Sequence, residues 1–271
     1  MLAGVAAPDT STAERCLLDE IADGVYRVSL HFAGLTTPEG LTVNQFLILG
    51  EEPLLFHTGL RSSFADVEAA VERVVPLRRL RWLSFGHLEA DECGSLDRFV
   101  AAAPHLGVCF GVGGGLFPLD GFADVPESAP ASDVLDLGGR RVRRIPTPHA
   151  PHNAEAQVLF EEVTGTLLCG DLFTQLGPAS AITGDQDIVE RAVEAEAELR
   201  TASAGRTVPA TLRRLADLEP RTLAVMHGSS FDGDGGEALR QLAGEWEARL
   251  LLDAASPCPP TDATNLKEDP R

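Results

Sequence analysis

Basic residues are scarce in this sequence. It has 22 lysines and arginines against 41 aspartates and glutamates, a net charge of −19, which disfavours nucleic acids and lipid headgroups as partners. Apolar runs near the ~20 residues of a membrane span are also absent. The N-terminal stretch MLAGVAAPDTSTAERC lacks a basic region followed by an apolar core. We therefore expect a cytoplasmic protein with no nucleic-acid or membrane partner, whose acidity serves solubility.

Cysteine pairs are missing as well. The sequence contains no CxxC pair, and its five cysteines are widely spaced: Cys16, Cys93, Cys109, Cys169 and Cys258. An odd, scattered set argues against both a disulfide framework and a cysteine zinc knuckle. The glycine-rich stretch GVGGGLFP, residues 111–118, lacks the lysine and Ser/Thr of a phosphate-binding P-loop, and we interpret it as a loop.

The remaining composition is that of a globular protein. With 271 residues, 44% of them hydrophobic, the chain can bury a large core. Both ends are aperiodic, and the C-terminal end is rich in proline and charge. We predict disordered tails over residues 1–18 and 253–271 and one domain over residues 19–252.

Strand-like and helical patterns are mixed through both halves of that domain. Apolar runs bounded by turn residues predict strands over residues 24–30, 42–49, 52–59, 80–85, 107–112, 140–147, 156–162, 165–171 and 222–227. Helical spacing of apolar residues predicts helices over residues 62–75, 94–104, 187–203, 207–218 and 236–252. Such a mixture indicates an α/β or α+β domain in which sheet packs against helices.

Polar residues end or closely follow several of the strand-like runs. His87 follows LSFG, His149 follows IPTP, His227 follows LAVM, and Asp171 ends TLLCGD. Loops at one edge of a sheet can place such side chains around a common centre. This is the arrangement that a metal site needs.

The motif HLEAD extends this set. Side chains two apart in extended backbone point to the same side, so His87, Glu89 and Asp91 can face one pocket. Each of these residues taken alone could instead lie at the surface or cap a helix, as Asp91 could. Six such residues at strand ends favour a shared site.

The order of the motifs HLEAD, TPHAPHN, LLCGD and VMHG resembles the metallo-β-lactamase fold superfamily. The closest resemblance is to the subgroup with glutamate in place of the second histidine of the first motif. That subgroup comprises the di-iron domain of flavodiiron proteins and stand-alone oxygen-binding di-iron proteins. The resemblance extends from about Gly24 to His227 and implies a four-layer αββα sandwich.

The resemblance also implies a set of metal ligands. One ion would be bound by His87, Glu89 and His149, and a second by Asp91 and His227, with Asp171 bridging the two. Three imidazoles and three carboxylates form a mixed nitrogen and oxygen set that suits iron or manganese. Zinc is an alternative, since it also binds carboxylate.

Three positions leave alternatives open. The family commonly has histidine where Glu92 stands; Glu92 either ligates or turns away and leaves the second site an open position. Superfamily members usually have aspartate where this chain has His57, which either lies beside the ligands or is simply buried. His152 competes with His149 as a ligand, and could instead line the pocket or shuttle protons; the resemblance favours His149.

The resemblance implies a protein that binds dioxygen or nitric oxide, for sensing or for reduction. Flavodiiron proteins carry a flavodoxin-like FMN domain, and the 44 residues after His227 do not accommodate one. We therefore expect reduction to require a separate electron-donor protein.

The alternative is a hydrolase of an ester, thioester, lactam or phosphodiester that uses a metal-bridging hydroxide. Glu89 favours the di-iron reading over this one, because the zinc hydrolases usually have histidine there. A scaffold that has lost its metal is disfavoured, because all six principal ligands are present. The sequence leaves the oligomeric state open.

Overall fold

The structure is a computed structural model that describes residues 16–110, 133–185, 187–203 and 205–255. The glycine-rich stretch 111–118 and most of both predicted tails lie outside the described residues. Regular structure extends slightly into the predicted tails, because a strand begins at Leu17 and the last helix ends at Ala255. Within the described ranges, no helix is both long enough and apolar enough to cross a bilayer.

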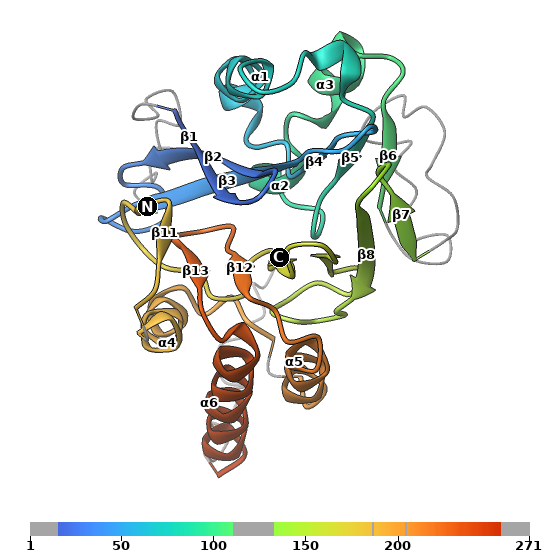
Figure 1. Ribbon diagram of the computed structural model, residues 1–271. Helices are drawn as coiled ribbons and strands as arrows, with labels where there is room; N and C mark the ends of the chain where they lie inside the picture. The colour runs from blue at the N-terminus through green and yellow to red at the C-terminus, as the bar shows by residue number, and fades with distance from the viewer. Residues whose placement is uncertain (1–15, 111–132, 186, 204, 256–271) are drawn as a thin grey trace, which may run out of the picture.

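Two sheets form the centre of the fold (Figure 1). The first sheet has six strands in sequential order, antiparallel from β1 to β4 and parallel from β4 to β6. The strands are β1 Leu17–Ala22, β2 Val25–Phe32, β3 Leu41–Ile48, β4 Leu54–Phe56, β5 Trp82–Ser84 and β6 Gly107–Cys109. Every residue of β3 is buried, as expected for a strand covered on both faces.

The second sheet has seven strands in the order β11-β13-β12-β10-β9-β8-β7. They are β7 Val134–Asp136, β8 Arg141–Pro146, β9 Gln157–Glu161, β10 Thr166–Leu168, β11 Ile182–Thr183, β12 Thr222–Ala224 and β13 Ser230–Asp232. At its centre β10 pairs parallel with β12, while β8, β9 and β10 pair antiparallel.

The helices present apolar stripes to the sheets. They are α1 Phe64–Glu72, α2 Ala90–Cys93, α3 Leu96–Ala102, α4 Ile188–Leu199, α5 Val208–Ala216 and α6 Gly235–Ala255, with short 3-10 turns at η1 Arg61–Ser63 and η2 Leu77–Arg79. In α4, for example, Ile188, Ala192 and Ala195 are buried at helical spacing. That stripe gives the helix one face to bury against its neighbours.

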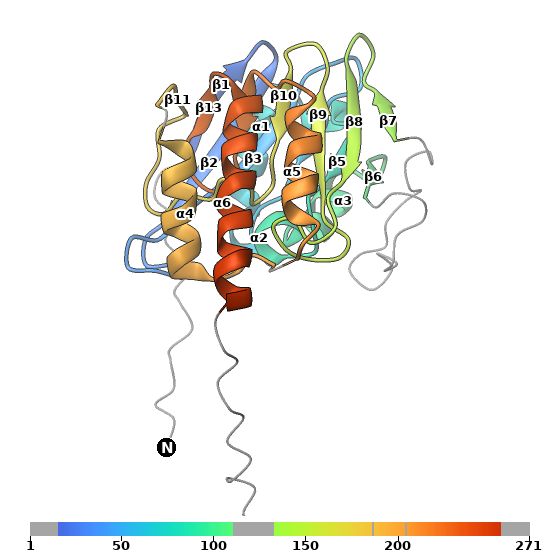
Figure 2. The same cartoon turned by 90° about the horizontal axis from the view of Figure 1, so that it is seen from below.

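The helices cover the outer faces of the two sheets and give four layers. Helices α1 and α3 lie over the first sheet, and α4, α5 and α6 lie over the second (Figure 1). Figure 2 shows the last three helices side by side. Three apolar clusters fill the spaces between layers. One includes Phe99 of α3, a second includes Phe46 of β3, and a third includes Leu212 of α5. The predicted four-layer αββα sandwich is confirmed.

Backbone hydrogen bonds join the two sheets near the ends of their strands. The Asn44 N–H in β3 donates to the carbonyl of Met226, just after β12, at 3.0 Å. The Gln157 N–H at the start of β9 donates to the carbonyl of Gly86, just after β5, at 2.8 Å. The segments that follow β5 and β12 therefore lie at a shared edge, where residues from both halves of the chain can meet.

Candidate metal centre

Side chains from both sheets converge at this edge. The first half of the chain supplies residues that follow β5, and the second half supplies the β8–β9 loop and the ends of β10 and β12. The residues brought together are His87, Glu89, Asp91, His152, Asp171 and His227.

Four of these residues form a compact group. His87, Glu89, His152 and Asp171 offer ligand atoms that all lie within 4.8 Å of one another. His87 Nε2 lies 3.1 Å from Glu89 Oε2, 3.0 Å from His152 Nε2 and 3.6 Å from Asp171 Oδ2. The His87 side chain is buried, whereas half of the Glu89 side chain is exposed, so the group lies at the floor of an open site.

A second group shares Asp171. His227 Nε2 lies 3.3 Å from Asp91 Oδ2 and 3.3 Å from Asp171 Oδ1. The other ring nitrogen of His227, Nδ1, lies 2.8 Å from the carbonyl oxygen of Thr42 in β3. That carbonyl accepts a hydrogen bond from Nδ1–H, which leaves Nε2 free to face the two carboxylates.

The two oxygens of Asp171 face different groups. Oδ1 faces His227, while Oδ2 lies 3.2 Å from His152 Nε2. Oδ1 is buried and has no hydrogen-bond partner among the described residues. A buried carboxylate oxygen in that position is costly unless a cation or a donor completes it.

The charges of the cluster shift its pKa values strongly. Burial lowers the pKa of His87, but the carboxylates of Glu92 and Glu89 outweigh burial and raise that pKa to about 12. Burial also lowers the pKa of His227, but Asp171 and Asp91 outweigh burial and raise that pKa well above its usual value. The pKa of Asp171 is held well below its usual range by His152 and His227, although burial raises it.

The residues present fit a pair of metal ions. Imidazole nitrogens and carboxylate oxygens converge on two adjacent points, and divalent cations bind such mixed sets. In the metal-free protein, the nearby carboxylates raise the pKa values of His87, His152 and His227 and so favour protons on these rings. Because metal ligands must be deprotonated, a bound cation would take the place of those protons.

The backbone explains how HLEAD reaches the site. Glu89 is extended, with φ −133° and ψ 157°, but helix α2 begins at the next residue. The prediction that HLEAD is extended is therefore wrong except at Glu89, because residues 86–88 form a bend and α2 begins at Ala90. Asp91 reaches the site from the first turn of α2, because a helical turn after an extended residue still projects that side chain toward His227.

The structure brings His152, and not His149, into the cluster. His149 is exposed and has φ 63°, and its N–H donates to the Asn153 carbonyl at 2.7 Å. His152 lies three residues further along the same loop, with Nε2 close to both His87 and Asp171. The preference for His149 is thus corrected, because the turn at the tip of the loop leaves that side chain in solvent.

Glu92 and His57 are both buried and face inward. Glu92 Oε1 lies 3.2 Å from His87 Nδ1 and 3.3 Å from His57 Nε2. Burial raises the pKa of Glu92, but the His57 and His87 rings outweigh it and lower that pKa to about 2. Of the two alternatives for Glu92, the geometry matches the one in which its side chain turns away from the second ligand group.

Sequence reasoning missed a buried polar network that supports the His227 segment. Arg27 and Asn44, both buried in neighbouring strands, are joined by a hydrogen bond from Arg27 Nε to Asn44 Oδ1 at 3.0 Å. Asn44 Nδ2 donates to the carbonyls of Val225 and Gly228, at 2.8 Å and 2.9 Å. The signal available was a polar side chain inside each of two otherwise strand-like runs, VYRVSL and TVNQFLIL.

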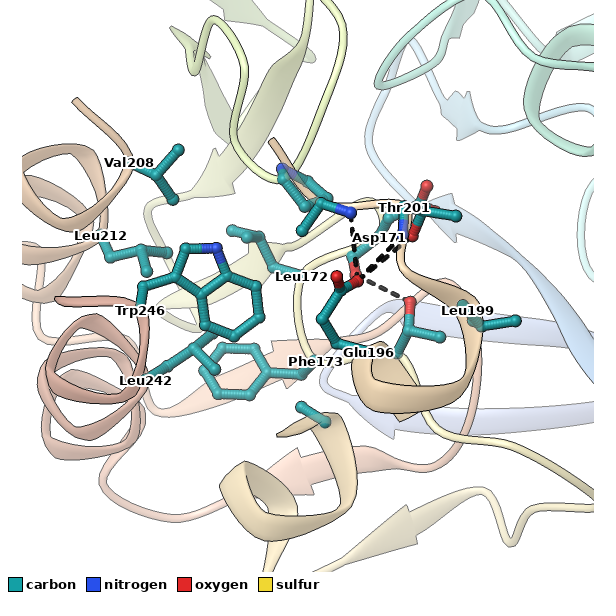
Figure 3. Close-up of a pocket in the computed structure, with 14 residues that line it drawn as sticks. Asp171, Leu172, Phe173, Glu196, Leu199, Thr201, Val208, Leu212, Leu242 and Trp246 are labelled. Atoms are coloured by element: carbon teal, nitrogen blue, oxygen red, sulfur yellow. Dashed lines mark hydrogen bonds between the residues drawn. The ribbon is translucent and has the colours of Figure 1, made fainter. Parts of the chain in front are cut away.

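Asp171 lines two separate hollows. A cleft of about 520 Å³ opens over the cluster and is lined by Glu89, Asp91, His152, Asp171 and His227, among others. A smaller cavity of about 30 Å³ is lined by Asp171 together with apolar side chains from α4, α5 and α6, including Leu212 and Trp246 (Figure 3). Glu196 beside that cavity is satisfied by the N–H groups of Thr201 and Ala202 and is structural.

Comparison with known proteins identifies the family. Residues 41–228 match the sequence model of the family described as ODP family beta lactamase. The chain belongs to this ODP family. The predicted resemblance to the metallo-β-lactamase fold is thereby confirmed.

A curated relative of this ODP family chain is a longer protein. A Nostoc sp. PCC 7120 protein named "Putative diflavin flavoprotein A 5" is 24% identical over 204 residues, which cover 70% of this chain and 34% of the relative. The ODP family chain therefore spans about a third of the length of that relative.

Solved structures share the fold. A fragment of the same Nostoc protein, residues 1–254, has a TM-score of 0.76 at 18% identity and covers 90% of this chain and 100% of the fragment. Rubredoxin oxygen:oxidoreductase from Desulfovibrio gigas has a TM-score of 0.71 at 21% identity, covering 85% of this chain and 62% of its own. The Flv1 flavodiiron core from Synechocystis sp. PCC6803 has a TM-score of 0.75 at 21% identity, covering 90% and 63%. The ODP family chain thus has the fold of flavodiiron cores.

Proposed function

We propose that this protein holds a dinuclear metal centre, with iron as the metal, and that the centre binds dioxygen or nitric oxide. One ion is assigned to His87, Glu89 and His152, and the other to Asp91 and His227, with Asp171 bridging them. The observation that carries this proposal is the position of Asp171, whose two oxygens face the two separate ligand groups.

The ligand chemistry supports iron over zinc. Three carboxylates offset most of the charge of two divalent ions, and an oxygen-rich set suits harder ions. Manganese and zinc remain the alternatives to iron. The fold shared with proteins named as a flavodiiron core and as an oxygen:oxidoreductase supports the same choice.

The residues of this chain would hold and orient the ions while the cleft admits the ligand. Bound iron supplies open coordination positions and redox chemistry. The Thr42 carbonyl fixes His227, and the exposed side of Glu89 leaves the site accessible from the cleft. Sensing requires only reversible binding. Reduction requires electrons, which we propose come from a separate electron-donor protein.

A metal-dependent hydrolase is the second candidate, and the size of the cleft favours it. A volume of about 520 Å³ is far larger than a diatomic ligand needs and lies within the range of small-molecule sites. In this case the two ions would activate water toward an ester, thioester, lactam or phosphodiester.

Metal content and the visible spectrum discriminate between the two functions. The protein is purified from iron-supplemented and from zinc-supplemented cultures, metal per chain is measured, and the iron form is reduced anaerobically and then exposed to air. We expect about two irons per chain and an absorption band that depends on oxygen. Two zincs from either culture, with a featureless spectrum, would instead support the hydrolase and contradict the proposal.

A further inference from the structure

A buried carboxylate and a buried imidazole lie directly behind one of the proposed ligands. The side chains of Glu92 and His57 are completely buried, and Glu92 Oε1 lies 3.2 Å from His87 Nδ1 and 3.3 Å from His57 Nε2. The second oxygen, Oε2, accepts a hydrogen bond from the His87 backbone N–H at 2.5 Å. Glu92 therefore contacts both the ring and the backbone of His87.

The fold is built around this carboxylate. A Cβ at Gly86 would lie 2.9 Å from Glu92 Oε1 and 3.0 Å from Oε2, so only glycine leaves the carboxylate its space. The backbone of Glu92 is also tied to the strand end beside it, because Thr58 N–H donates to the Glu92 carbonyl at 2.6 Å. Backbone and side chain thus hold the carboxylate in one place.

His57 completes the arrangement from the other side. Its Nδ1 lies 3.3 Å from the Asn44 carbonyl oxygen, and its Nε2 faces Glu92, so each ring nitrogen faces an acceptor. His57 is therefore the second imidazole, after His87, that lies against this buried carboxylate. His57 directly follows β4 and Glu92 lies in α2, so the contact between them joins these two elements.

We propose that Glu92 is a positioning residue, held by His57, that fixes the ring orientation and tautomer of His87. A carboxylate on one ring nitrogen of a ligating histidine leaves the other nitrogen for the metal. In His87, Nδ1 lies beside the Glu92 carboxylate, whereas Nε2 lies near the carboxylates of Glu89 and Asp171. This inference rests on the proposed function, in which His87 binds metal.

The same pair accounts for two departures of the sequence from its superfamily. The superfamily that the sequence resembles usually has aspartate where this chain has His57, and commonly has histidine where it has Glu92. The structure places the two side chains in contact, so the two departures affect one pair of neighbouring residues. The carboxylate comes from α2 instead of from the end of β4.

Glu92→Gln tests the role with a side chain of the same shape. We expect Co²⁺, used as the probe ion, to bind about 10- to 100-fold more weakly in a chelator competition. The N–H resonance of His87, shifted by the bound Co²⁺, is expected to move and to exchange faster with solvent. The matched control is Glu161→Gln, which alters an equally buried glutamate in β9 whose oxygens accept the N–H groups of Val163 and Thr164.

Two further variants keep the test independent of folding. Gly86→Ala retains Glu92 and its charge but crowds the carboxylate, and we expect it to move the same His87 resonance. The double variant His57→Asp with Glu92→His restores the superfamily pair, and we expect it to recover Co²⁺ affinity that each single change loses.

The outcomes separate this inference from the proposed function. A wild-type chain that binds Co²⁺ through His87, together with a Glu92→Gln chain of unchanged affinity and unchanged resonance, overturns the positioning role alone. A His87→Ala chain that binds as much Co²⁺ as wild type overturns the proposed function and this inference with it.

Discussion

At the scale of single residues, Asp171 is the side chain shared by the two ligand groups. Its Oδ1 is buried and faces His227, and its Oδ2 faces His152. Replacing one oxygen by an amide nitrogen leaves an oxygen for only one ion. The two groups then lose the carboxylate that joins them.

Asp171→Asn is therefore expected to reduce metal content from about two ions per chain to one or fewer. Metal analysis after gel filtration measures this directly. Asp217→Asn, at an exposed position beyond α5, is the control and should keep both ions. Two ions per chain in Asp171→Asn would show that this residue does not bridge.

The β8–β9 loop gives a second comparison between residues of the same type. His152→Ala removes a ring that lies 3.2 Å from Asp171, whereas His149→Ala removes an exposed ring from the same loop. We expect His152→Ala to lose about one ion per chain and to bind metal at least tenfold more weakly. His149→Ala should match wild type in metal content, and equal losses in both variants would contradict the assignment.

The ligand residue types were predictable from the sequence, but the choice within the loop was not. His87, Glu89, Asp91, Asp171 and His227 follow strand ends, and the register of the strands fixes where such residues emerge. The motif TPHAPHN has two histidines, and which one faces inward depends on the turn that places His149 at φ 63°. Spacing along the chain carries no information about that turn.

At the scale of elements, segments with a clear apolar run or period were predicted, whereas the strands β1, β7, β11 and β13 were missed. The runs that became β2, β3 and α4 have enough residues to show a clear period. Strands β7, β11 and β13 have two or three residues each and lie outside any long apolar run, whereas the equally short β4 lies in such a run and was predicted. Such strands exist because neighbours pair with them, and pairing between distant segments is not visible in a local pattern.

Helix α6 permits a matched test of packing. Leu242 is 1% exposed in the cluster beneath the helices, and Leu251 on the same helix is 72% exposed. We expect Leu242→Ala to lower the free energy of unfolding by about 2–5 kcal/mol, because it leaves a cavity. Leu251→Ala should change it by less than about 0.5 kcal/mol.

Urea unfolding followed by circular dichroism provides the two free energies. The comparison holds helix propensity constant, because both changes replace leucine with alanine in the same helix. Similar values for the two variants would mean that α6 does not pack against the second sheet as the structure shows.

At the scale of the whole molecule, the candidate centre joins the two halves of the chain. The segment after β5 contributes His87, Glu89 and Asp91, and the second half contributes His152, Asp171 and His227. Anything that binds the assembled cluster and not the unfolded chain stabilises the fold by mass action. Removal of metal by a chelator should therefore lower the melting temperature of the entire domain.

The pH dependence of stability should differ between the metal-free and the metal-loaded forms. In the metal-free protein the pKa of His87 is raised to about 12, and the pKa values of His152 and His227 are also raised. The pKa of histidine in the unfolded chain is about 6.5, so the folded state binds more protons than the unfolded state above that pH. The stabilisation is complete below about pH 6.5 and is lost as pH rises toward the folded pKa values.

Acid should weaken the metal-free protein as well. The pKa of Glu92 is lowered to about 2 and that of Asp171 lies well below its usual range. These carboxylates contribute stability above the unfolded pKa of about 4, and the contribution is lost as pH falls through their folded values. Stability of the metal-free protein should therefore be greatest near about pH 5 to 6.5 and should decline on both sides.

Metal opposes the alkaline loss of stability, because protons compete with the cation for the imidazole nitrogens. From pH 6 to pH 9 we expect the melting temperature of the metal-free protein to fall, while the difference between metal-loaded and metal-free protein widens. Differential scanning calorimetry of both forms at one-unit pH intervals measures the two slopes. Parallel curves would mean that the ions do not replace protons on His87, His152 and His227. That result would contradict the assignment of these histidines as metal ligands.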